Sequence, residues 1–212
     1  MMSAPHGAAT NPNSALGQMT EVASGIARRM RITWLVKHAS KRPVLALYVT
    51  INCAISILIL GVIAVVWHQP MVFPSLGPTA FLLFFLPLGV QSAPRNVFEG
   101  QLIAVVCGFG ALLIFGLVGV PTHPTDMSVA RICAVAIAIA ACAGFMVLFD
   151  RLHAPACAST AIIAIGVFNT LWDCLILMIG VALLILQSLA INRLAGYKVP
   201  WWGPIREESA PA

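Results

Sequence analysis

An uncharged apolar run from Val44 to Trp67 is the feature that most restricts how this chain folds. A helix of about 20 apolar residues crosses the hydrocarbon core of a bilayer, and this run is longer than that. Pro43, directly before it, is a residue favoured at the start of a helix. Three further segments of spanning length follow, at 97–120, 129–149 and 174–191. The sequence therefore predicts an all-α, polytopic membrane bundle with four full-length transmembrane helices.

The amino-acid composition excludes a water-soluble globular protein. Of the 212 residues, 60% are hydrophobic and only 9% are charged, and the mean hydropathy is +0.95. A soluble domain usually carries about a quarter charged residues, so this chain has too little polar surface to face water. In a membrane, its length provides about six helices of roughly 20 residues each. We therefore expect one compact membrane domain over residues 43–192.

Two shorter apolar stretches lie between the long ones and indicate an internal repeat. Each follows a segment rich in proline, glycine or other small residues, and each is too short for a comfortable full crossing. The segments PSLGPTA at 74–80 and PACASTA at 155–161 share proline, threonine and alanine at matching places. The order long, short, long thus occurs twice, which predicts two pseudo-repeats over about 43–120 and 129–192. The two short membrane helices either cross the bilayer or are re-entrant.

The distribution of lysine and arginine predicts the topology. Six of the twelve cationic residues make residues 1–42 a basic arm, which we expect to be cytoplasmic and largely disordered. If both short segments cross, Arg95, Arg151 and the tail at 193–212 lie on the same side as this arm. If the short segments are re-entrant, Arg95 and Arg151 move to the outer side, which fits the positive-inside rule worse. We therefore favour six crossings, a location in the inner membrane and cytoplasmic termini.

The starts of the two short helices are the strongest candidates for a binding site. A helix that begins inside the membrane leaves its first N–H groups unpaired and presents the positive end of its dipole, which attracts an anion. Hydroxyl donors flank these ends, and glycine and proline shape the backbone beside them. The candidate residues of this anion path are Ser75, Gly77, Pro78, Thr79, Pro155, Ser159 and Thr160. The alternative is that these residue types only permit close helix packing and kinks.

Four more polar residues lie close to these segments. His153 precedes the second short segment and can hold an anion when protonated or take part in proton coupling; the alternative is an interfacial histidine bonded to a backbone carbonyl. Arg95 and Asn96 follow the first short segment and fit a gate or an anion funnel, although Arg95 equally fits a topology determinant. Glu99, the one acidic residue within a long segment, is either a functional group or a helix cap.

Other classes of function find no support in the sequence. None of the six cysteines forms a CxxC pair and all lie within apolar segments, so we expect no metal site. The chain contains no GxSxG, HExxH, P-loop or dinucleotide-binding motif, and we therefore expect neither catalysis nor a cofactor. The basic arm lacks interleaved aromatic residues, which argues against nucleic-acid binding.

Three segments resemble the HPP family of integral membrane proteins, which is named for a His-Pro-Pro motif. They are FPSLGPTAFLLFFLP, SAPRNVFEGQLIAVVCG and LHAPACASTAIIAIG, and the similarity covers about residues 40–204. Two positions depart from the family pattern, because the motif reads His153-Ala154-Pro155 and the pair expected as Gly-His reads Gly100-Gln101. The resemblance implies a protein described with four helices and a carrier or channel for small anions, with nitrite transport in some members.

We therefore expect a membrane transporter or channel for a small inorganic anion such as nitrite. The anion would lie between the opposed N-termini of the short helices, near Thr79 and Thr160, with His153 and Arg95 tuning access or charge. The expected partners are the lipid bilayer, the anion and further copies of the chain in a homo-oligomer. The alternative function is a non-transporting membrane scaffold, or a sensory or assembly subunit, whose tail binds a partner.

Overall fold

The computed structural model describes residues 41–120, 122 and 127–205 of the protein. Within these residues, the regular secondary structure consists of six α-helices and one short 3-10 helix, without strands. This confirms the predicted all-α fold. The basic arm predicted over residues 1–42 lies almost wholly outside the described residues, as does the end of the tail.

Four helices are long and apolar enough to cross a membrane: α3 (Lys41–Trp67), α5 (Pro94–Ile114), α6 (Val129–Leu148) and α8 (Leu171–Leu194). They confirm the four predicted spans, but three of them begin earlier than expected, α3 at Lys41 rather than at Val44. α5 starts at Pro94. Proline suits the first turn of a helix, because the N–H group that it lacks would have no partner within the helix at that position. α8 starts three residues before Cys174, because the side chains of Thr170 and Asp173 form a capping box that satisfies two N–H groups.

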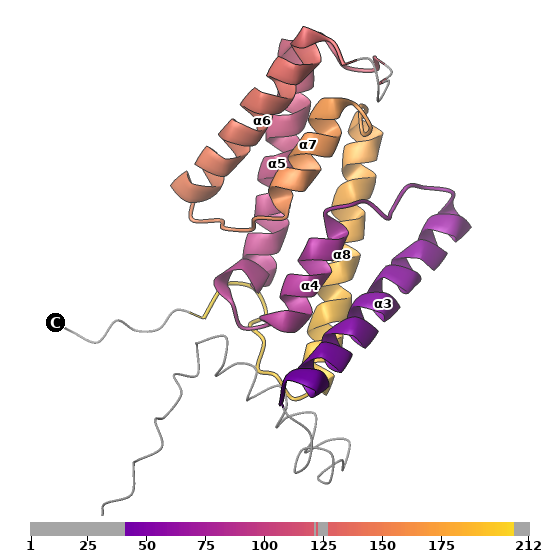
Figure 1. The fold of residues 1–212 in the computed structure, drawn as a ribbon, viewed down its shortest axis with the longest axis vertical. Coiled ribbons are helices and arrows are strands. Elements are labelled where there is room, and N and C mark those ends of the chain that lie inside the picture. Colours follow the sequence, from indigo (N-terminus) through magenta and orange to yellow (C-terminus); the bar gives the residue numbers. More distant parts are fainter. Residues whose placement is uncertain (1–40, 121, 123–126, 206–212) are drawn as a thin grey trace, which may run out of the picture.

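The two predicted short helices are α4 (Leu76–Phe85) and α7 (Ala156–Ile165). Figure 1 shows α4 in the lower half of the bundle and α7 in the upper half, each starting near mid-height. In this view α3 and α6 end near the same height, and irregular segments lead from their ends across to the starts of the short helices. α4 is followed by the 3-10 helix η1 (Val90–Ser92), which leads into α5. Each short helix therefore spans about half the height of the bundle.

The helices alternate in direction along the chain, and α5 and α8 occupy the centre of the bundle (Figure 1). In the most apolar windows of α5 and α8, 44% and 50% of the residues are buried, against 22% in α3 and 28% in α6. α5 packs against α6, α7 and α8, and α8 packs in addition against α3 and α4. The two outer long helices, α3 and α6, therefore present most of their surface to the surroundings.

The same pairs of helices are in contact when α3, α4 and α5 are exchanged for α6, α7 and α8, although α5 packs more extensively on α6 and α7 than α8 does on α3 and α4. α3 packs on α4 as α6 packs on α7, and α3 packs on α8 as α6 packs on α5. α4 packs on α8 as α7 packs on α5. The contact between α5 and α8 is unchanged by the exchange, because it joins the last helix of each half. Each half of the chain therefore contributes its last helix to the packing of the other half.

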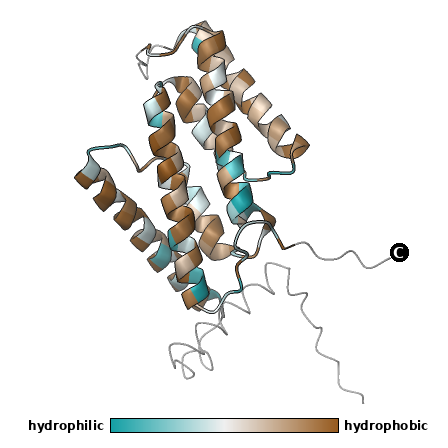
Figure 2. Cartoon of the chain, turned by 180° about the vertical axis from the view of Figure 1, so that it is seen from behind, coloured by the Kyte–Doolittle hydropathy of each residue, from teal (hydrophilic) through white to brown (hydrophobic). Residues whose placement is uncertain are grey.

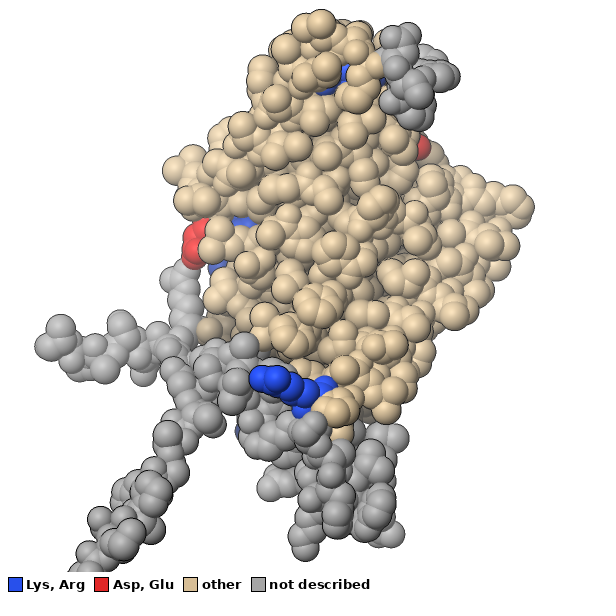
Figure 3. All heavy atoms as spheres, in the orientation of Figure 1, with Lys and Arg blue, Asp and Glu red and all other residues tan. Residues whose placement is uncertain are grey.

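The outer surface of the bundle is hydrophobic. Several large apolar side chains on α3 and α6 are more than two-thirds exposed, among them Val65 at 74% and Val147 at 71%. Figure 2 shows hydrophobic residues along most of the length of the long helices, with hydrophilic turns toward the lower end of the bundle, and Figure 3 shows a broad face with few charged side chains. Water disfavours an apolar surface of this extent, whereas acyl chains cover it without penalty. The chain is therefore a membrane protein with several apolar helices.

Candidate functional site

The starts of α4 and α7 meet, and two of their hydroxyl groups form a direct hydrogen bond. The Oγ atoms of Ser75, at the N-cap of α4, and Ser159, in the first turn of α7, lie 2.6 Å apart. Ser159 donates its proton to Oε1 of Gln101 on α5, also at 2.6 Å, and it therefore accepts the proton of Ser75. All three side chains are completely buried. They form a hydrogen-bonded chain that connects the two short helices to the centre of the bundle.

His153 and Thr79 extend this hydrogen-bonded chain. Nε2 of His153 lies 3.1 Å from Oγ1 of Thr79, and Nδ1 lies 2.9 Å from the carbonyl oxygen of Gln91. Because a carbonyl only accepts, Nδ1 of His153 carries a proton. The hydroxyl of Thr79 also lies 2.8 Å from the carbonyl oxygen of Ser75, which connects the histidine to the serine pair. We call these five buried side chains the polar cluster: Ser75, Thr79, Gln101, His153 and Ser159.

A glycine on α5 lets the chain between α6 and α7 come close enough to position His153. A Cβ atom on Gly100 would lie 2.9 Å from Cβ of His153 and 3.3 Å from the carbonyl oxygen of Arg151. The side chain of Arg151 forms an ion pair with Glu99, one residue before this glycine. Glu99, a functional candidate from the sequence, is therefore paired with Arg151, and this ion pair holds the segment between α6 and α7 against α5.

The first amides of the short helices are engaged in turns rather than free. The first three N–H groups of α7 donate to the carbonyls three residues before them, at 3.0 to 3.1 Å. At the start of α4, the N–H of Leu76 donates to the carbonyl of Phe73 at 3.0 Å. These groups differ from the unpaired amides expected from the sequence, because a tight turn precedes each helix. The positive ends of both helix dipoles still point toward the polar cluster.

Three residues predicted for the anion path lie away from the polar cluster. Gly77 and Pro78 are exposed on the first turn of α4, and a Cβ atom placed on Gly77 would meet no atom within 4 Å. Arg95 lies in the first turn of α5, where its N–H donates to the carbonyl of Trp202 at 2.9 Å. This contact places Arg95 at the lower end of the bundle, beside the tail, and its role as a gate remains a prediction.

Asn96, Pro155 and Thr160 are buried and contact the backbone around the polar cluster. Nδ2 of Asn96 donates to the carbonyl of Val90 at 2.9 Å and so ties η1 to α5. Pro155 is the N-cap residue of α7. The hydroxyl of Thr160 lies 3.2 Å from the carbonyl of Ala156, one turn earlier in the same helix. Thr160, although it matches Thr79 in the proposed repeat, therefore bonds to a carbonyl of its own helix and, at 3.5 Å, to that of Ala104 on α5, and not to the histidine.

Gln101 and Arg131 were not predicted as site residues from the sequence. Gln101 was noted only as a departure from a family pattern, yet it accepts the hydrogen bond of Ser159. Arg131 is 4% exposed, and its guanidinium donates to the carbonyls of Ile165 at 2.7 Å and Val120 at 3.2 Å. It thereby satisfies the C-terminal end of α7. Both residues carry the same signal, a polar side chain inside an apolar segment.

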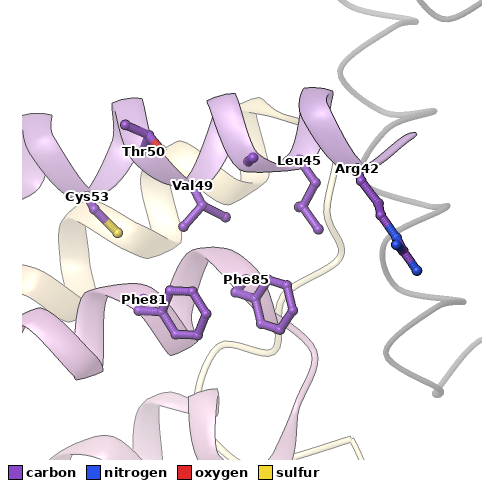
Figure 4. Close-up of a pocket in the computed structure, with 8 residues that line it drawn as sticks. Arg42, Leu45, Val49, Thr50, Cys53, Phe81 and Phe85 are labelled. Atoms are coloured by element: carbon purple, nitrogen blue, oxygen red, sulfur yellow. The ribbon is translucent and has the colours of Figure 1, made fainter. Parts of the chain in front are cut away.

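A groove of about 550 Å³ opens between α3 and α4, separate from the polar cluster (Figure 4). Figure 4 shows Arg42 at one end of it and the rings of Phe81 and Phe85 along one wall. The groove is mostly apolar and is lined by Arg42, Leu45, Ala46, Val49, Thr50, Cys53, Phe81 and Phe85. It contains none of the residues predicted for the anion path.

Comparison with known proteins identifies a family that agrees with this architecture. A family model described as "HPP, transmembrane region" matches residues 38–200, which include almost the whole helical bundle. Neither a curated protein nor a solved structure matches the chain. The family match covers well over half of the sequence, so the resemblance noted from the sequence is confirmed. The chain belongs to the HPP family of membrane proteins.

Proposed function

We propose that the protein is a transporter or channel for a small inorganic anion such as nitrite, and that the anion passes through the polar cluster. The observation that carries this proposal is the meeting of two half-height helices, start to start, with Ser75 bonded to Ser159 inside an apolar bundle. Interrupted helices at matching places in two halves are typical of binding sites in secondary transporters. Buried polar groups in a membrane are costly, which favours a functional role for this cluster.

The polar cluster offers the chemistry that a small anion requires. Ser75 and Ser159 are hydroxyl donors, Gln101 carries an amide, and two helix dipoles point their positive ends at the same place. An anion that enters beside the serines would replace the hydrogen bond between them and accept from the hydroxyl of Ser75, while Ser159 keeps its hydrogen bond to Gln101. Such a site binds an anion through dipoles, without an ion pair that would hold it too tightly for passage.

His153 supports a coupling of this transport to protons. In the neutral imidazole, the single hydroxyl proton of Thr79 has two acceptors, Nε2 of His153 and the carbonyl of Ser75. In the protonated imidazole, both ring nitrogens donate, and Thr79 accepts from Nε2 while it donates to the carbonyl of Ser75. Protonation therefore changes the direction of one hydrogen bond next to the serine pair, and a proton arriving with the anion would offset its charge.

We also propose that both short segments cross the membrane, which makes the two halves inverted repeats. The alternating helix directions and the packing that survives exchange of the halves support this topology. Arg95, at the start of α5, and Arg193, at the end of α8, lie at the same end of the bundle as the start of α3, whereas the α6–α7 connection that carries Arg151 lies near mid-height in the view. Arg131, in the first turn of α6 at the other end, is buried against carbonyls. The positive-inside rule then orients the lower end of Figure 1, with both termini, to the cytoplasm of an inner membrane.

Anion flux into proteoliposomes that contain the purified protein tests this function. The wild-type protein is compared with a Ser75→Ala, Ser159→Ala double variant, for nitrite, nitrate and chloride. The matched control is Ser188→Ala on α8, because this buried serine donates within its own helix, to Ile185 at 2.9 Å. We expect the double variant to lose most of the flux and the control to keep it. If no anion moves under a pH gradient or a voltage, the scaffold function is favoured instead.

A further inference from the structure

One donor in the polar cluster has no acceptor in the part of the chain that the structure describes. Gln101 is completely buried, and its Oε1 accepts the proton of Ser159. Its Nε2, on the same amide, is buried without a hydrogen-bond partner among the described residues. Buried polar atoms of folded proteins almost always have a partner, either in the protein or in a bound molecule. The geometry therefore calls for a further molecule with an acceptor atom beside Ser159.

The position of this donor connects it to the proposed anion path. The amide of Gln101 ends the hydrogen-bonded chain that runs from Ser75 through Ser159. In that chain each serine proton already has an acceptor, so a molecule that bonds to a serine must break an existing hydrogen bond. A molecule that bonds to Nε2 of Gln101 breaks none. Nε2 is therefore the group that gains most when a ligand arrives.

The charges around the cluster restrict which anion can bind. Among the described residues, no lysine or arginine side chain hydrogen-bonds to the five members of the cluster. The guanidinium of Arg151, which is close in sequence to His153, is paired with Glu99. A buried divalent anion needs more compensating charge than hydroxyls, an amide and a single histidine supply. A monovalent anion has a smaller desolvation cost and can be held by such donors.

We propose that Nε2 of Gln101 is the donor that determines specificity in this site, and that the site takes a monovalent anion and rejects divalent ones. This inference rests on the proposed anion transport and names its substrate class. Gln101 binds the anion while Ser159 holds the amide in place through Oε1. The residue therefore acts by direct contact with the substrate.

The test compares anion binding by the full-length protein in detergent with that of three variants. Gln101→Glu keeps the acceptor for Ser159 but replaces the donor, and Gln101→Met removes both. The matched control is Gln187→Met on α8, because Gln187 also has a buried amide atom without a partner but no hydrogen bond to the cluster. Sodium nitrite and sodium sulfate are titrated by calorimetry, and the thermal unfolding of each variant is recorded to show that it is folded.

We expect saturable nitrite binding and no sulfate binding by the wild-type protein and by Gln187→Met. Both Gln101 variants should bind nitrite at least about tenfold more weakly, the loss typical of one hydrogen bond to a charged group. Gln101→Glu should recover binding relative to the wild type at low pH, where the protonated carboxyl again donates, and a purely structural role would not produce this recovery.

Three results would overturn the inference. Unchanged nitrite binding by folded Gln101 variants would mean that Nε2 serves only a bound water, while anion transport through the serines would stand. Sulfate binding equal to nitrite binding would refute the monovalent class. Absence of binding of any anion to the wild-type protein would remove the proposed function together with the inference.

Discussion

Replacing Gly100 by alanine should destabilise the protein, whereas the same replacement at Gly110 on the same helix should not. A Cβ atom at position 100 would lie 2.9 Å from Cβ of His153, closer than two carbons can approach, whereas at position 110 it would meet no atom within 4 Å. The new methyl group must therefore push His153 away from α5. Such overpacking costs about 1–3 kcal/mol.

The displacement of the histidine adds a second cost. Its two hydrogen bonds, to Gln91 at 2.9 Å and to Thr79 at 3.1 Å, contribute about 1 kcal/mol each when formed. Alanine also gains about 1 kcal/mol over glycine in a helix. The sum for Gly100→Ala is a loss of about 2–4 kcal/mol in the free energy of unfolding. In Gly110→Ala only the higher helix propensity of alanine contributes, so this variant should be more stable than the wild type by up to about 1 kcal/mol.

The assay is reversible unfolding of both variants in mixed micelles by titration with a denaturing detergent, with the imidazole resonances of His153 recorded by NMR as a local probe. Gly100→Ala should shift these resonances and unfold earlier, and Gly110→Ala should leave them unchanged. If the two variants have equal stability, or if the resonances of His153 stay in place in Gly100→Ala, the close approach of the α6–α7 connection to α5 is refuted.

Two further predictions concern helix ends. Gly166→Ala should lower the free energy of unfolding by more than about 2 kcal/mol, because φ at this residue is +95° and a Cβ atom would collide with the guanidinium of Arg131. Unfolding by a denaturing detergent measures this loss, and a loss below about 1 kcal/mol would contradict the prediction. Thr170→Ala should lower the free energy of unfolding by about 1 kcal/mol, because the capping box with Asp173 is lost. The same assay measures this change, and an unchanged free energy of unfolding would mean that α8 needs no cap.

Family membership changes how two departures in this chain are understood. Where the family motif has its first proline, this chain has Ala154, and its N–H donates to Oε1 of Gln91 at 3.1 Å. A proline has no N–H, so it could not form this bond. Where the family pattern expects a histidine, Gln101 contributes an amide that does not titrate in the physiological range. His153 is therefore the one histidine of the polar cluster in this chain.

The local pattern of the sequence was sufficient to predict the helices. Long apolar runs predicted the four spanning helices, and the Pro- and Gly-containing segments predicted the starts of the short ones, because helix length and hydrophobicity depend on neighbouring residues. The start of α8 was missed, because NTLWD looks like a polar loop until Thr170 and Asp173 are recognised as a capping box. Arg131 was not predicted, because a prediction from the charges of the loops does not include a residue inside an apolar run.

The sequence by itself determined that this chain is a helical membrane protein of the HPP type, with hydroxyl groups at the starts of two short helices. Only the tertiary structure decided which of these groups meet. Ser75 bonds to Ser159, 84 positions away, while Gly77 and Pro78 face outward from the same helical turn. The rotation of each helix about its axis is set by packing against distant helices, and that rotation decides whether a side chain points into the bundle or away from it.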